Sequence, residues 1–143
     1  MLKGIPSILS PELLLLMAHM GHGDELVLAD ANFPAASIGR RLVRADGHGV
    51  VALLEAVLKL FPLDRFVDQP AAVMQRVDSP HEPVPIWAEF QRALGQADGR
   101  PVSIERIERF TFYERARNAF GVVATGETAL YGNLIIKKGV ISQ

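Results

Sequence analysis

The stretch GHGDELVLAD, residues 21–30, decides the fold. Its centre is the unbroken apolar run Leu26–Ala29, which is closed by Asp30 and then by Asn32 and Pro34. A short apolar run bounded by turn-forming residues predicts a buried strand, either central in its sheet or paired in parallel. Open α/β sheets bind ligands at the carboxyl ends of their strands, so Asp30 is a candidate binding residue. The same position also suits a turn or helix-capping aspartate.

Helical and extended patterns alternate on both sides of this strand. Ser10, Pro11 and Glu12 indicate a helix start, because serine caps free amides, proline presets φ and glutamate meets the positive helix end. Gly21 offers a left-handed cap after that helix. We expect helices at residues 11–20, 50–61, 86–99 and 112–120, and further strands at residues 42–43, 71–77, 102–104, 122–125 and 134–136. The alternation predicts a single α/β domain over residues 1–143, with helices covering a parallel or mixed sheet.

The composition excludes several classes of protein. A net charge of -1 over 143 residues is unlike the basic surface of a nucleic-acid binder. The chain has no cysteine, which excludes disulfides and thiolate catalysis. Prolines interrupt the apolar N-terminus, and no run is long enough to cross a membrane, so we expect a cytoplasmic protein. With 49% hydrophobic residues, a small domain often shares apolar surface with copies of itself, which favours a homo-oligomer.

Cofactor motifs are absent from the sequence. It contains no glycine-rich dinucleotide fingerprint, no phosphate loop and no GxSxG nucleophile elbow. The four histidines show no paired i, i+4 spacing of the kind that binds zinc. We therefore expect neither a cofactor nor a metal.

Several polar positions could still carry chemistry. His22 lies between two glycines, where backbone can approach a ligand closely, and histidine is a residue type that can both donate and accept a proton. Arg109 places a charge between two apolar residues, and the Tyr131–Asn133 segment precedes an expected strand. Each also has a plain structural interpretation: a surface-loop histidine, a solvated arginine on an alternating strand, and a turn. Asp46, followed by glycine, is still more typical of a turn.

Seven motifs occur in a specific order along most of the chain. They are SPELL (10–14), MGHGDE (20–25), LADANFPA (28–35), RADG (44–47), LLEAVLKLFPLD (53–64), IERFTFYERA (107–116) and ATGETALYGN (124–133). Together they resemble the fucose mutarotase and ribose pyranase family, of the RbsD/FucU type, and more closely its fucose branch. Residues 77–102 contribute no motif to the resemblance.

The resemblance implies a three-layer, Rossmann-like sandwich that assembles into rings, up to a decamer, or into smaller oligomers, with the sugar site near subunit contacts. It implies cofactor-free interconversion of the α and β anomers of a free monosaccharide, L-fucose, by acid/base ring opening and closing. The family's general acid falls on His22. Its substrate-binding residues fall on Asp30, Arg109, Tyr131, Gly132 and Asn133. In the ribose branch the position of Arg109 is a histidine and GHGD differs, so both departures favour fucose.

One geometric conflict arises within this set. His22 and Asp30 flank the expected strand, which would separate them by roughly 20 Å at about 3.3 Å per residue. Either the chain folds back after Ala29, or the pocket combines residues of two subunits, which is the alternative we favour. Three other functions remain open: a D-ribose pyranase, a sugar-binding protein without catalysis, and a purely structural α/β oligomer.

Overall fold

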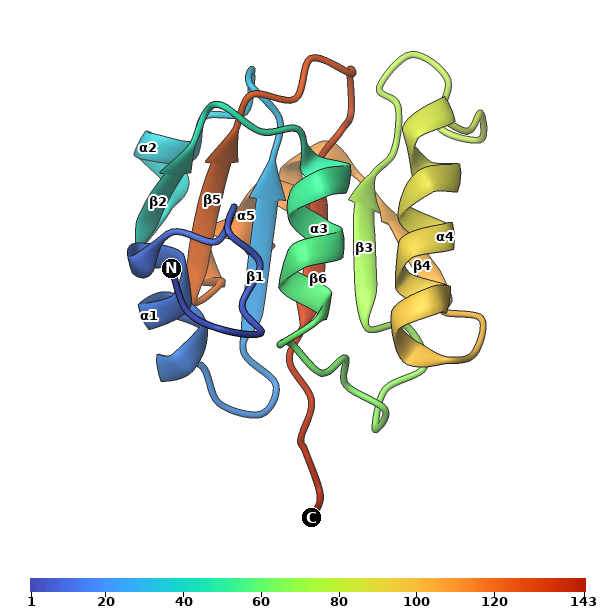
Figure 1. Ribbon diagram of the computed structural model, residues 1–143. Coiled ribbons are helices and arrows are strands. Elements are labelled where there is room, and N and C mark those ends of the chain that lie inside the picture. Colours follow the sequence, from blue (N-terminus) through green and yellow to red (C-terminus); the bar gives the residue numbers. More distant parts are fainter.

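The computed structural model describes all of residues 1–143 and contains a six-stranded sheet with helices on both faces (Figure 1). The helices are α1 (Pro11–His19), α2 (Ala35–Ile38), α3 (Val50–Leu58), α4 (Pro85–Asp98) and α5 (Arg109–Asn118). The strands are β1 (Glu25–Ala29), β2 (Leu42–Ala45), β3 (Ala71–Met74), β4 (Ile104–Ile107), β5 (Gly121–Thr125) and β6 (Leu134–Lys137). No helix is long and apolar enough to cross a membrane.

Five of the strands run in one direction and β6 runs against them. The order across the sheet is β2-β5-β1-β6-β3-β4, with parallel pairs on each side and β6 antiparallel to both β1 and β3. The carboxyl ends of the five parallel strands therefore share one edge of the sheet with the start of β6. We call this the carboxyl edge, and the opposite one the amino edge. The expected mixed sheet is confirmed.

The sheet separates two apolar cores. Alternate residues of β1 face opposite sides, so Leu26 and Leu28 pack in one core while Val27 and Ala29 pack in the other. The first core joins the sheet to α1, α3 and α4, and the second joins it to α2 and α5. Figure 1 shows the same division, with α1, α3 and α4 in front of the sheet and α2 and α5 behind it. The expected three-layer sandwich is therefore confirmed.

Helix ends follow the sequence signals with informative exceptions. Ser10 caps α1 as expected, because its hydroxyl accepts a hydrogen bond from the Leu13 amide at 3.1 Å. The left-handed glycine that follows α1 is Gly23, with φ 85°, and not Gly21. Helix α3 has no cap of its own. Its first amide, from Val50, donates instead to a Glu127 carboxylate oxygen at 3.2 Å, so a distant loop closes this helix.

The structure corrects three sequence expectations. Residues 35–49, which carry turn signals, include the short helix α2 as well as strand β2. Helix α3 ends at Leu58 rather than near Phe61, and β3 ends at Met74 rather than Val77. In addition, the Arg115 guanidinium on α5 bridges Glu25 at 2.5 Å and Glu105 at 3.0 Å. Such a pairing of distant strands cannot be recognised from helix periodicity.

Gly126 provides a test of the packing at the carboxyl edge. A Cβ atom there would lie 2.1 Å from the Asp46 carbonyl oxygen, which belongs to backbone and cannot move aside cheaply. We expect Gly126→Ala to lower the free energy of unfolding by about 1–3 kcal/mol in urea denaturation. Gly47→Ala is the matched control, because a Cβ there meets nothing within 4 Å. Equal stability of both variants would contradict this close contact.

Candidate functional site

A buried carboxylate–amide pair forms the centre of the carboxyl edge. Asp30 follows β1 directly, and its amide donates to Asn133 Oδ1 at 2.7 Å, while Asn133 Nδ2 donates to Asp30 Oδ2 at 3.0 Å. Asp30 Oδ1 accepts a further hydrogen bond from the Asn32 amide at 3.0 Å. Burial raises the pKa of the Asp30 carboxyl, and these hydrogen bonds act in the opposite direction. The aspartate is thus a turn residue and a buried polar group at once.

Tyr131 and Gly132 are positioned by the tight turn before β6. Tyr131 has φ 57°, in the left-handed region, and its phenol oxygen accepts a hydrogen bond from the Val77 amide at 3.2 Å. Because the amide uses an acceptor site, the phenol hydrogen stays available to another partner. At Gly132 a Cβ atom would lie 2.8 Å from the Ala129 carbonyl oxygen, so this close turn requires glycine.

Arg109 reaches the same edge from a helix start. It is the first residue of α5 and not a strand residue, because the Glu108 carboxylate accepts the amides of Phe110 and Thr111 at 2.9 and 3.1 Å and so starts the helix immediately after β4. The guanidinium lies over the Phe110 ring at 4.5 Å. Its Nε atom is buried without a hydrogen-bond partner, which makes it a donor that a bound hydroxyl could satisfy.

A cavity of about 390 Å³ opens beside Asp30. Its lining includes Asp46 and Arg44, which form a bidentate ion pair with oxygen–nitrogen distances of 2.6 and 2.9 Å. Asp46 therefore belongs to an Arg–Asp pair at the rim of this cavity, in addition to its turn role. Asp30 lines this cavity, whereas Arg109, Tyr131, Gly132 and Asn133 do not.

His22 lies at the other edge of the sheet. The loop that carries it is tied to the end of β6, since the Gly23 amide donates to the Lys138 carbonyl at 2.8 Å. The imidazole Nε2 is 3.1 Å from Asp64 Oδ1, and the Phe66 ring lies 5.3 Å from the imidazole. The His22 side chain is 45% exposed, whereas Asp64 is buried, so one face of the ring is held and the other is open.

Asp64 is the site residue that sequence reasoning missed. Burial works to raise the pKa of its carboxyl, but hydrogen bonds from the Phe66 amide and His22, with help from Lys137, hold that pKa below its usual value. Asp64 is buried and directly follows the mostly apolar stretch Leu58–Leu63, whereas most aspartates are exposed. That contrast is the signal that could have identified it.

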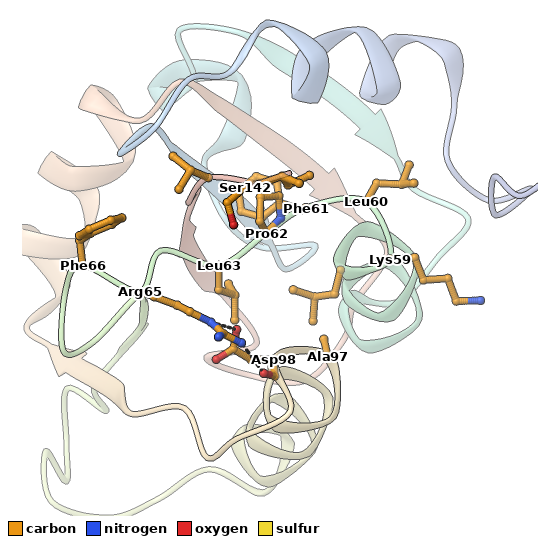
Figure 2. A pocket seen from close by; sticks show the side chains of 13 residues that line it. Lys59, Leu60, Phe61, Pro62, Leu63, Arg65, Phe66, Ala97, Asp98 and Ser142 are labelled. Carbon is orange, nitrogen blue, oxygen red and sulfur yellow. Dashed lines mark hydrogen bonds and ion pairs between the residues drawn. The ribbon is translucent and has the colours of Figure 1, made fainter.

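A second cavity, of about 520 Å³, adjoins this edge (Figure 2). Phe66 lines it together with the end of α3, the end of α4 and the C-terminal residues Val140–Ser142. Figure 2 shows Arg65 reaching from the same loop to Asp98, with the Arg65 Nε 3.3 Å from the carboxylate. The ion pair fixes the loop that presents both Asp64 and Phe66.

Asp30 contacts Asn133, which follows Tyr131 and Gly132 in one turn, and Arg109 starts α5 after β4 on the same edge of the sheet. His22 is anchored beside Asp64 at the amino edge. Asp30 stays at the carboxyl edge, because β1 runs in register with β5 up to Ala29 and Asp30 follows directly. The chain returns to the amino edge only after Asp30, through α2 to the start of β2. Within one chain, the length of β1 separates the imidazole from the other groups.

The six-stranded sheet with helices on both faces is an open α/β fold, a class of proteins that bind ligands outside the carboxyl ends of their strands. The model of the RbsD / FucU transport protein family matches residues 3–141. The chain belongs to this family.

Individual relatives agree with that assignment. The fucose mutarotase of Homo sapiens is 59% identical over 147 residues, covering 99% of this chain and 95% of that protein. The crystal structure of the fucose mutarotase from Streptococcus pneumoniae in complex with L-fucose matches with a TM-score of 0.93 and 44% identity, covering 99% of this chain and 100% of that chain. The Bacillus subtilis RbsD complexed with D-ribose matches with a TM-score of 0.71 at 19% identity, over 99% of this chain and 100% of that chain, and shares the fold.

The pKa of the Asp30 carboxyl should lie above the ordinary aspartate pKa of about 3.9, and that of Asp64 below it. Asp64 stabilises the fold above its unfolded pKa, and that stabilisation is lost as pH falls through its lowered folded pKa. For Asp30 the dependence is the opposite. Its contribution to the free energy of unfolding is present below the unfolded pKa and is lost as pH rises through its raised folded pKa. Carboxyl ¹³C NMR titration checks the order, with Asp64→Asn and Asp30→Asn as assignment controls. A higher pKa for Asp64 than for Asp30 would contradict the expectation.

Proposed function

We propose that this protein is an L-fucose mutarotase, an isomerase that interconverts the α and β anomers of the free sugar. The observation that carries the proposal is the 59% identity with human fucose mutarotase over almost the whole of both chains. The likeness to a mutarotase crystallised with L-fucose supports it. We further propose that the protein acts in the cytoplasm, on a free monosaccharide.

The reaction needs proton transfer but no change of oxidation state. Ring opening requires the anomeric hydroxyl to lose a proton and the ring oxygen to gain one as the C1–O5 bond breaks. The open aldehyde then rotates about C1–C2 and closes on its other face with the reverse proton transfers. A single group that both accepts and donates a proton near neutral pH is sufficient for this chemistry.

His22 is the proposed proton-transfer residue. Asp64 is an acceptor when ionised, so its contact with Nε2 favours the tautomer in which Nε2 carries the hydrogen. Nδ1 is then the nitrogen that exchanges a proton with the sugar. The buried carboxylate also stabilises the imidazolium that forms when the anomeric proton is taken up. Phe66, against the imidazole, limits rotation of the ring.

The sugar-binding groups of the proposal are those at the carboxyl edge. Asp30 and Asn133 offer carboxylate and amide atoms to sugar hydroxyls, the buried Nε of Arg109 is an unused donor, and the Tyr131 phenol retains its hydrogen. Gly132 lets the backbone approach closely. Paired donors and acceptors of this kind fix the orientation of a small polyhydroxylated ligand.

We propose that the complete site forms between two subunits packed head to tail, with the amino edge of one on the carboxyl edge of the next. Exposed apolar side chains support this arrangement at both edges: Phe66 and Ile141 are 77% and 74% exposed at one edge, and Leu130 and Phe110 are 68% and 61% exposed at the other. Contacts between two different surfaces form rings when the rotation between neighbouring subunits closes, so this packing is compatible with the expected homo-oligomer. Such packing would bring His22 of one copy to Asp30 of another.

The imidazole provides the first test. His22→Ala should reduce catalysed anomer exchange of L-fucose by about 10²–10⁴-fold, measured by saturation-transfer NMR, because it removes the proton-transfer group. His19→Ala is the matched control, since His19 lies exposed in the last turn of α1. Full exchange in His22→Ala would refute the assignment. Faster exchange of D-ribose ring forms than of fucose anomers would instead indicate a pyranase, and sugar binding without exchange a non-catalytic protein.

Co-expression tests the shared site. His22→Ala and Arg109→Gln should each be inactive alone, yet random mixed oligomers should recover about a quarter of wild-type activity, because one interface in four then combines an intact His22 with an intact Arg109. Mixing His22→Ala with Asp64→Ala is the control, since both residues lie at the amino edge and no subunit then holds the intact pair. Absence of recovery in the first mixture would place the whole site in one chain.

A further inference from the structure

Tyr131 has an unfavourable backbone conformation that its surroundings must maintain. With φ 57°, it is the one non-glycine residue of the chain with positive φ. The left-handed region brings the Cβ atom close to carbonyl oxygen, which is costly for a bulky aromatic residue. Strain of this kind persists where neighbouring groups hold the residue in place, and it is frequent at binding sites.

Two hydrogen bonds from another part of the chain hold Tyr131 at both ends. The indole Nε1 of Trp87 donates to the Tyr131 carbonyl oxygen at 3.1 Å, and the Val77 amide donates to its phenol oxygen at 3.2 Å. Val77 lies in the connection after β3, and Trp87 lies in the first turn of α4. The backbone and the ring tip of Tyr131 are thereby fixed by a segment more than 40 residues away in the sequence.

The indole of Trp87 is itself immobilised. Only 5% of Trp87 is exposed, and its ring packs in the core that joins α4 to the sheet. The Arg106 guanidinium covers the ring at 5.0 Å. A buried indole N–H is a donor without acceptor capacity, so the Tyr131 carbonyl is the partner that satisfies it. The direction of this hydrogen bond is therefore set by core packing.

We propose that Trp87 is a positioning residue of the sugar site: its indole N–H keeps Tyr131 in the left-handed conformation and so places the phenol, Gly132 and Asn133 for binding. This inference rests on the proposed function for its consequence in catalysis. The turn leads directly into Asn133, whose amide holds Asp30, so a relaxed Tyr131 would disturb both partners. His22, at the other edge of its own chain, does not depend on this turn.

Trp87 is the single tryptophan of the chain, so a tryptophan analogue that lacks the indole N–H would be incorporated at this position alone. Global incorporation of β-(3-benzothienyl)alanine for tryptophan keeps the shape of the ring and replaces the N–H by sulfur at this position alone. We expect KM for L-fucose to rise about fivefold, as for the loss of one ordinary hydrogen bond, with kcat and its pH profile unchanged. A crystal structure should show Tyr131 φ moved from its left-handed value. Trp87→Phe serves as a second variant without the donor.

Arg106→Gln is the matched control, because it removes the cation over the indole but leaves the N–H in place. It should leave KM and Tyr131 φ unchanged. An unchanged KM and φ in the benzothienyl protein would overturn the proposal, and so would a fall in kcat alone. If the wild-type protein does not accelerate fucose anomer exchange, the proposed function fails, while Tyr131 φ in the substituted protein still decides whether Trp87 holds the turn.

Discussion

The buried pair of Asp30 and Asn133 is the interaction on which the carboxyl edge depends. It links the end of β1 to the start of β6, the one strand that runs against its neighbours. A buried carboxylate and amide are costly unless they are hydrogen-bonded. Here the Asn133 side-chain amide donates to the Asp30 carboxylate, and the Asp30 backbone N–H donates to the Asn133 side-chain oxygen. The reciprocal hydrogen bonds therefore fix where the Tyr131 turn lies, and with it the groups available to a sugar.

The length of β1 is the second constraint, because it places Asp30 and His22 at opposite edges. Under the proposed function each edge holds part of the machinery: the carboxyl edge holds the proposed hydroxyl-binding groups, and the amino edge holds the imidazole paired with Asp64. Exposed apolar residues, such as Phe66 and Leu130, border both edges. A head-to-tail interface would bury this apolar surface and join the two half-sites, so association and catalysis would be linked in one contact.

Much of the fold follows from local patterns, and the differences arise from contacts that these patterns do not show. The capping serine of α1 and the apolar run of β1 predicted their elements correctly, because each signal acts within a few residues. For Arg109 the sequence left a solvated strand position open as the structural alternative, and this alternative is wrong because Glu108 accepts the next amides and starts a helix. Arg115 on α5 pairs with Glu25 and Glu105, which lie on two different strands. Pairing across strands leaves no periodic trace.

The sequence by itself determined the layered α/β class, the family resemblance and the identity of the six candidate residues, because periodicity, caps and ordered motifs are properties of neighbouring positions. It also indicated that one extended strand keeps His22 from Asp30. Only the tertiary structure decided which groups meet: Asp64 with His22, Asn133 with Asp30, and Trp87 with the carbonyl of Tyr131. These contacts join residues that are more than 40 positions apart. They depend on strand order and helix packing, which local sequence patterns do not encode.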